Sequence, residues 1–396
     1  MKRLLSIVAL VVVALLSACS NKEVVRDTEP IYTPRYAQGF AIERDKASGE
    51  MLLCINNPWQ GAENTIYYTP LNAEKPAQRI VAMSSSYVAM LDAVGCTERI
   101  VGISGCRFIS TPSACKAIEE GKIAEVGYDA AFDFERIKSL NADVVLLYGV
   151  VGEAKSFTNK LDELSIPYIY IGDYLENDPL GKAEWVVALS YLCGCEERGK
   201  EFFAGVEERY NALRNKQHCS AYKPRVMLNL PYRDTWFMPS KESYMVRLIE
   251  DADGEYVLGR ETRDERREKD AKCLIKQNKT FNSQFSILNS QLKKANTSKP
   301  ISLEEALVLA SRADFWLNLG QINSLAELRV AVPRFMGVDA VKFARIYNNT
   351  KRTNPSRGSD FWESGAVRPD LVLRDLVQIL HYEAPTDSLY YYKKLQ

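Results

Sequence analysis

The sequence is poor in histidine and carries no excess charge of either sign. Two of its 396 residues are histidines, His218 and His381. Sites for bare zinc or manganese usually combine several histidines with carboxylates, so this composition argues against binding of an uncomplexed transition metal. Lysine plus arginine and aspartate plus glutamate both number 51. This balance gives no electrostatic reason to expect a nucleic-acid partner.

Long hydrophobic runs are also missing. The apolar run from Leu4 to Leu16 has thirteen residues, whereas about 20 are needed to span a bilayer. Two basic residues precede it and a small-residue cleavage site follows it, which is the order of a secretory signal. We therefore expect a signal peptide over residues 1–18 and a polar tether over residues 19–35.

The cysteine at the cleavage site makes this segment resemble a bacterial lipoprotein signal. The resemblance implies cleavage before Cys19 and lipidation of its thiol, so the mature protein would lie in the periplasm, anchored to a bacterial membrane by its N-terminal lipid. The sequence does not indicate which membrane holds the anchor.

Eight further cysteines follow Cys19, without the paired spacing of a zinc ribbon. An exported protein is able to form disulfides. Cys193 and Cys195 are too close in sequence to pair comfortably with each other. Cys106 and Cys115 form a geometrically plausible pair, and the other pairings stay open.

One short pattern occurs twice in the chain, about 170 residues apart. Each copy starts with a glutamate at the head of a predicted helix, Glu135 or Glu304, and continues to an Ala-Asp pair that ends in Asp143 or Asp314. An apolar strand follows each pair. Paired elements of this kind predict two similar α/β lobes.

The periodicity along the chain supports this division. Residues 36–78 contain short alternating runs that predict a small antiparallel β meander. Strands and helices alternate over residues 79–178 and again over 219–396, which is typical of mostly parallel sheets covered by helices. Two successive amphipathic helices form a stiff connector over residues 179–218. Within the second lobe, residues 260–299 are charged and polar without an apolar face, which indicates a solvated insertion whose role stays open.

The order of these segments resembles the substrate-binding proteins of bacterial ABC importers for iron chelates and vitamin B12. The resemblance implies two Rossmann-like lobes joined by a rigid backbone helix, the class III periplasmic binding protein fold, and no cofactor. The N-terminal meander and the 260–299 insertion depart from a minimal member. The segments that carry the resemblance are Arg79-Ile80-Val81, Leu91 to Gly102, Glu135 to Asp143, Pro167, Tyr347-Asn348-Asn349 and Arg368-Pro369-Asp370.

The resemblance also implies an ABC permease dimer as a partner. In this family one exposed glutamate on each lobe docks into arginine pockets of the permease, and the matching positions are Glu135 and Glu304. A glutamate in the first turn of a helix is favoured by the helix dipole and stays ionised and solvated. The same property makes such acids common as local stabilisers, which is the alternative interpretation.

A ligand site is expected where strand ends of one lobe face the other lobe. Aromatic side chains bury large flat ligands at little entropic cost, and guanidinium groups suit anionic chelates. The candidates are Ser86, Tyr87, Arg107, Phe108, Tyr128, Tyr148 and Tyr174 from the first lobe, and Tyr232, Arg233, Trp236, Gln321 and Asn348 from the second.

The identity of the ligand stays open between an iron chelate, a corrinoid and haem. Arginines such as Arg107 and Arg233 favour an anionic ferric siderophore, whereas the aromatic residues favour a nearly neutral corrinoid, and a tyrosine is a suitable ligand for haem iron. The alternatives to a transport receptor are an esterase-like enzyme that uses Ser84 to Ser86 and a structural surface lipoprotein. No Gly-x-Ser-x-Gly elbow surrounds these serines, so we expect them to cap the following helix.

The lipid anchor is directly testable. Replacing Cys19 by alanine removes the thiol that would carry the lipid, so Cys19→Ala should leave the membrane fraction and appear as a soluble or unprocessed form. Cell fractionation followed by immunoblotting measures this, and unchanged membrane association of the variant would contradict the interpretation.

Overall fold

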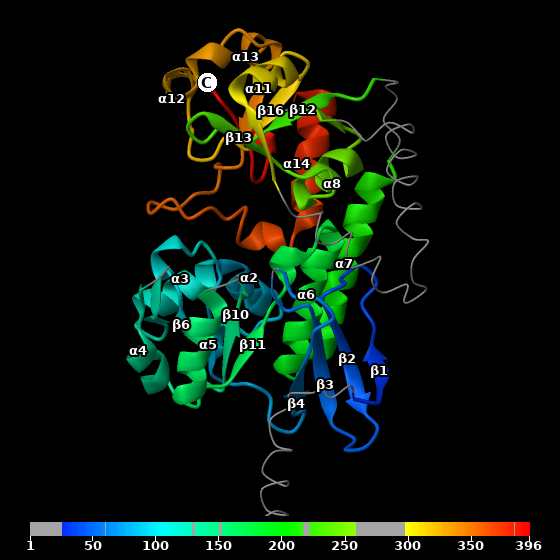
Figure 1. Ribbon diagram of the computed structural model, residues 1–396, viewed down its shortest axis with the longest axis vertical. Helices are drawn as coiled ribbons and strands as arrows, with labels where there is room; N and C mark the ends of the chain where they lie inside the picture. Colours follow the sequence, from blue (N-terminus) through cyan, green and yellow to red (C-terminus); the bar gives the residue numbers. More distant parts are fainter. Residues whose placement is uncertain are drawn as a thin grey trace, which may run out of the picture.

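The computed structural model describes residues 26–59, 61–128, 131–149, 153–216, 222–258, 298–383 and 385–396. Two α/β lobes lie at opposite ends of a bundle of long helices, and a small antiparallel sheet lies beside the first lobe (Figure 1). This is the architecture that the sequence predicts. The predicted signal peptide, Cys19 and nearly all of the 260–299 insertion lie outside the described residues.

The N-terminal sheet has four antiparallel strands in the order β1-β2-β3-β4. Three of them were predicted, and β1 is an addition that pairs with β2 inside the range expected to be a tether, so that range was set too long. Their bounds are β1 (Thr28–Tyr32), β2 (Phe40–Asp45), β3 (Met51–Asn56) and β4 (Ile66–Leu71).

The first lobe contains a five-stranded parallel sheet with the order β11-β10-β5-β6-β7. When these five strands are renumbered 1 to 5 in chain order and the sheet is read from its β7 edge, the order is 3-2-1-4-5, as in a Rossmann fold. The strands are β5 (Ile80–Ala82), β6 (Ile100–Ile103), β7 (Ala124–Glu125), β10 (Val144–Leu147) and β11 (Tyr168–Tyr170). The helices are α2 (Ser85–Ala93), α3 (Pro112–Glu119), α4 (Phe134–Ser139) and α5 (Glu153–Glu163), and a short hairpin joins β8 (Gly127–Tyr128) to β9 (Ala131–Phe132).

The second lobe has the sheet order β14-β12-β16-β17-β18, with β18 antiparallel to its neighbour. Its strands are β12 (Arg225–Leu228), β14 (Glu255–Tyr256), β16 (Phe315–Leu317), β17 (Ile346–Asn348) and β18 (Lys393–Lys394), and β13 (Thr235–Met238) pairs with β15 (Lys299–Ser302). Its helices are α8 (Tyr244–Asp251), α11 (Leu303–Ala310), α12 (Leu325–Ala331), α13 (Asp339–Lys342) and α14 (Pro369–Tyr382).

The connector consists of α6 (Pro179–Leu192) and α7 (Glu196–Arg214), as predicted. The two helices approach closely, because a Cβ built at Gly199 would lie 2.2 Å from the hydroxyl of Ser190. At its other end α7 binds the second lobe, where Arg209 forms an ion pair of 2.7 Å with the buried Asp370 of α14. Within the described parts of the chain, no helix is both long and apolar enough to cross a bilayer.

The repeated sequence pattern occupies the same place in both lobes. Asp143 accepts hydrogen bonds from the backbone N–H groups of residues 78 and 79, at 2.8 and 2.9 Å, just before β5. Asp314 accepts one from the N–H of Arg225, at 2.7 Å, where β12 begins. Each aspartate therefore joins the start of its own strand to the start of the neighbouring strand, and the predicted equivalence of the lobes has a physical basis.

Candidate functional site

The topology places the predicted loops at the carboxyl ends of both sheets. Ligands of open parallel sheets bind outside these ends, at the point where the strand order reverses. The reversal lies between β5 and β10 in the first lobe and between β12 and β16 in the second. The loops at these points carry Tyr148, which is 41 % exposed, Tyr232, which is 65 % exposed, and the exposed Gln321. Arg233 lies with its guanidinium 5.3 Å from the centre of the Tyr232 ring.

A second group of predicted residues meets at the ends of β6 and β7. The guanidinium carbon of Arg107 lies 4.6 Å from the ring centre of Phe108 and 5.8 Å from that of Tyr128. The two rings are 4.9 Å apart. Glu125 holds the turn between them, since its carboxylate accepts hydrogen bonds from the backbone N–H groups of residues 105 and 106. The arrangement presents a cation and two aromatic faces, with Arg107 and Tyr128 exposed.

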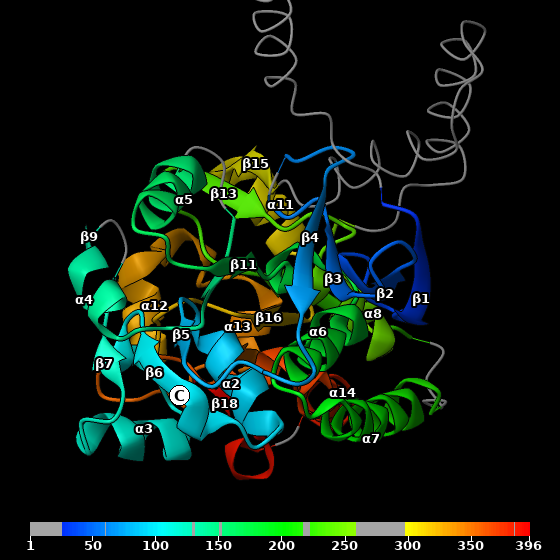
Figure 2. The ribbon, with the colours of Figure 1, turned by 90° about the horizontal axis from the view of Figure 1, so that it is seen from below.

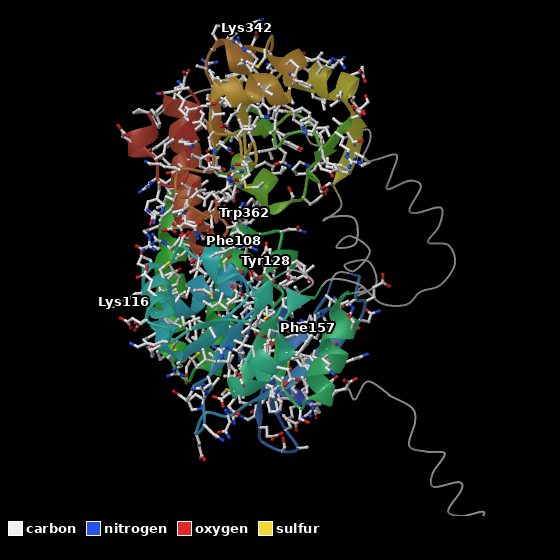
Figure 3. The ribbon with its side chains drawn as sticks, turned by 90° about the vertical axis from the view of Figure 1, so that its left-hand side faces the viewer. Phe108, Lys116, Tyr128, Phe157, Lys342 and Trp362 are labelled. Carbon is white, nitrogen blue, oxygen red and sulfur yellow. The ribbon has the colours of Figure 1, made fainter. Side chains whose placement is uncertain are left out.

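Trp362 extends this surface from the second lobe. Figure 3 shows Trp362, Phe108 and Tyr128 at the level where the two lobes meet. Trp362 is 56 % exposed, and its ring packs at 4.8 Å against the buried ring of Phe361. The sequence did not indicate Trp362, because it lies in the irregular loop well beyond the end of β17, where no strand or helix period applies.

Glu363 binds this loop to the first lobe. Its buried carboxylate accepts hydrogen bonds from the backbone N–H groups of Ser110 and Thr111, both at 2.8 Å, and from the Thr111 hydroxyl. The side-chain amide of Asn354 donates to the carbonyl oxygens of Arg107 and Ile109, each at 3.0 Å. These bonds join the segment that follows β6 to the loop that follows β17 across the lobe boundary.

Two predicted ligand residues are instead buried in the core. Tyr87 is fully buried, and its hydroxyl donates to the carbonyl oxygens of Leu147 and Ile171 at the ends of β10 and β11. Trp236 is also fully buried, with its indole N–H donating to the Leu228 carbonyl at 3.0 Å. The prediction for these two side chains was wrong, because the sequence does not determine which side of a short element faces inward.

Three other predicted residues support loops. Asn348 is buried, and its side chain accepts from the N–H of Leu319 and donates to the carbonyl oxygens of residues 320 and 322. Ser86 is buried beside Ser84, whose hydroxyl caps α2 as expected by accepting from the Ser86 N–H. Tyr174 is half-buried, and its hydroxyl donates to the Gly149 carbonyl. Asn348 and Ser86 are buried within the protein and present no surface to a ligand, which corrects the prediction for both.

The thiols predicted as a pair do not meet. The thiol of Cys106 points to the carbonyl of Ile103 at 3.7 Å, and that of Cys115 points to the carbonyl of Ile109 at 3.4 Å. Both are free cysteines. Among the residues that the structure describes, no group of three or more histidine, cysteine, aspartate or glutamate side chains is arranged to hold a metal ion.

The two predicted docking glutamates occupy equivalent positions. Glu135 and Glu304 are each the second residue of a helix, and each helix is capped by a side chain one residue before its start, Asp133 or Ser302. Both glutamates are exposed. Glu304 forms an ion pair of 3.1 Å with Arg334, and a backbone N–H together with this guanidinium lowers the pKa of its carboxyl.

Replacing Glu363 by glutamine tests the bond between the lobes. The amide keeps one acceptor oxygen and turns its NH₂ group toward an N–H donor, so the free energy of unfolding should fall by about 1–3 kcal/mol. Urea titration measures this change, and the exposed Glu74→Gln serves as the matched control.

The same variant has an expected pH dependence. Burial raises the pKa of the Glu363 carboxyl above its ordinary value. The stability linked to this raised pKa is complete below the unfolded-state pKa and is lost as the pH rises through the folded-state pKa. The stability advantage of the wild type over Glu363→Gln should therefore be larger near pH 4 than near pH 8, and an equal difference at both values would contradict the assignment.

Comparisons with known proteins agree with this geometry. The family model of the periplasmic binding proteins matches residues 80–278, about half of the chain. An uncharacterized lipoprotein of Methanocaldococcus jannaschii is 26 % identical over 320 residues, which cover 78 % of this chain and 66 % of that protein, so the chain spans about two thirds of this relative's length.

Solved structures show the same fold at low sequence identity. A possible iron-binding (periplasmic solute-binding) protein of Staphylococcus epidermidis has a TM-score of 0.54 and 16 % identity, covering 78 % of this chain and 100 % of that one. A periplasmic haem binding protein of Pseudomonas aeruginosa has a TM-score of 0.54 and 15 % identity, covering 81 % and 98 %. With two lobes, a helical connector and the family pattern over residues 80–278, this chain belongs to the periplasmic binding protein family.

Proposed function

We propose that this periplasmic solute-binding protein is a lipid-anchored receptor that delivers an iron chelate, a ferric siderophore, to an ABC importer. The observation that carries the proposal is the position of Arg107 over the rings of Phe108 and Tyr128, with the loop that carries the exposed Trp362 bonded to the same segment. A ferric siderophore is oxygen-rich and generally anionic at its metal centre. An exposed guanidinium supplies charge-assisted hydrogen bonds to such a ligand, and the rings supply flat apolar contacts.

The arginines favour the chelate over a corrinoid. Arg107 and Arg233 both lie over aromatic rings at strand ends, one in each lobe. A nearly neutral corrinoid would gain little from two cations, so it is the second candidate. Haem is the third, because exposed tyrosines such as Tyr128, Tyr148 and Tyr232 are able to supply an axial oxygen ligand. The Pseudomonas aeruginosa structure is of a haem binding protein, and the Staphylococcus epidermidis structure is of a possible iron-binding protein. The comparisons therefore do not distinguish an iron chelate from haem as the ligand.

Titration of the purified protein with ferric siderophores, cobalamin and haem tests the ligand class. Trp362 is exposed, so its fluorescence should be quenched by a bound complex, and Trp362→Phe should remove most of this signal. For an anionic chelate, Arg107→Ala should weaken binding by about 10- to 100-fold, the loss expected for one charge-assisted hydrogen bond. Arg44→Ala, a matched change on the N-terminal sheet, should leave affinity unchanged.

The outcome distinguishes the candidates. Affinity for cobalamin or haem that survives Arg107→Ala but falls on Tyr128→Ala would assign the site to that ligand instead. Absence of binding to all three classes would count against the receptor function itself, and turnover of generic ester substrates would favour an enzyme.

The proposal includes docking to a permease dimer through Glu135 and Glu304. Both side chains are exposed at equivalent helix starts in the two lobes, so a partner with two matching arginine pockets is able to contact both. Glu304 already pairs with Arg334. A permease arginine would therefore replace an existing ion pair at Glu304, and Arg334→Ala should make this glutamate more available.

Charge reversal separates docking from ligand binding. Glu135→Lys or Glu304→Lys should abolish uptake while ligand affinity stays unchanged, and the double variant should bind reconstituted permease more weakly still. High salt should reproduce part of the defect, because exposed charges are screened. The neighbouring Glu305→Lys is the matched control, and normal uptake by the double variant would refute the assignment.

A further inference from the structure

Three cysteines meet where the first lobe joins the helical connector. Cys96 follows α2, while Cys193 ends α6 and Cys195 precedes α7, with Gly194 between them. The Sγ atoms of Cys96 and Cys195 are 3.7 Å apart although the residues are 99 positions apart in the sequence. The packing of α2 against α6, visible in Figure 2, produces this meeting. Cys193 lies near enough to Cys96 to influence the pKa of its thiol.

Two arginines surround this three-thiol cluster of Cys96, Cys193 and Cys195. Arg198 extends Nη2 to 3.9 Å from the Cys96 sulfur, and Arg99 donates to the Cys193 carbonyl at 2.6 Å. The neighbouring thiols of Cys193 and Cys195, together with both guanidinium groups, lower the pKa of the Cys96 thiol. Burial raises the pKa of the Cys195 thiol.

The three thiols differ in access to solvent. Cys96 and Cys193 are fully buried, whereas Cys195 is partly exposed. A reagent from solvent therefore reaches Cys195 first. The buried Cys96 is the only one of the three placed to react with Cys195, because Cys193 and Cys195 flank a single glycine and are too close in sequence to bond to each other comfortably.

We propose that the three-thiol cluster is a redox-active site in which Cys96 and Cys195 form a reversible disulfide. The sulfur atoms need only approach from 3.7 Å to about 2.05 Å.

The oxidant is a disulfide, either a small molecule or a protein. The Cys195 thiol loses its proton, and its sulfur attacks one sulfur of the oxidant, whose S–S bond breaks and releases one thiolate. The Cys96 thiolate then attacks the Cys195 sulfur of this mixed disulfide, forms the new S–S bond and expels the second thiolate. In total the two cysteines lose two electrons and two protons, and the oxidant is reduced to two thiols.

The disulfide would fasten the first lobe to the connector. Cys195 stands at the start of α7, and the same helix reaches α14 of the second lobe through Arg209 and Asp370. Oxidation therefore links the end of α2 covalently to the helix that joins the lobes. The inference does not depend on the identity of the transported ligand.

Peptide mapping tests the proposal on the whole protein. The reduced protein is incubated with oxidised glutathione, alkylated and digested without reduction, and mass spectrometry should find the Cys96 and Cys195 peptides joined. The melting temperature should rise by several degrees on oxidation and fall back on reduction. Cys195→Ser removes the thiol that the oxidant reaches first, so it should prevent the disulfide from forming, and Cys96→Ser should abolish every bond within the cluster. Cys54→Ser, a buried thiol on β3, is the matched control and should change nothing.

Two results would overturn the proposal. One is full alkylation of all three thiols after oxidation. The other is glutathione that remains on Cys195 without transfer to Cys96. Cys195→Ser alters a partly exposed residue, so it gives an answer even if Cys96→Ser does not fold.

Discussion

Buried carboxylates that accept hydrogen bonds from the backbone hold the irregular segments of this protein in place. Glu184 of α6 is fully buried and accepts from the Tyr32 hydroxyl and from three successive N–H groups at residues 35–37. Asp375 of α14 accepts from the N–H groups of residues 390–392, which lead into β18. A buried N–H without a partner costs about 1–3 kcal/mol, so one carboxylate that serves several donors stabilises a segment that has no regular structure of its own.

The same kind of contact shapes the candidate site. Glu363 joins the loop that carries Trp362 to the loop that carries Arg107. The hydrogen bonds therefore fix the separation between these two loops. Burial raises the pKa of the carboxyls of both Glu363 and Asp375, while their hydrogen bonds oppose the shift. A site held in this way before the ligand arrives spends less of its binding free energy on ordering loops. The connector is also rigid, because α6 and α7 pack too closely at Gly199 to slide past each other freely.

Acidic residues thus have two distinct roles, and their position on a helix separates them. Glu184 and Asp375 lie within α6 and α14 on buried faces and bind backbone groups of the protein itself. Glu135 and Glu304 lie in the first turns of α4 and α11 and face solvent. The sequence shows both kinds as acidic residues of predicted helices, and exposure is what makes the second pair suitable for a partner.

The sequence by itself determined the two lobes, the helical connector, most strands and helices and the equivalence of the Asp143 and Asp314 units, because hydrophobic period and helix caps are local properties. Only the tertiary structure decided that Tyr87 and Trp236 belong to the core, that Trp362 lies at the lobe boundary, and that Cys96 meets Cys195. The physical reason is that these outcomes depend on how helices and loops far apart in the chain pack against one another. A contact across 99 positions leaves no periodic pattern near either residue.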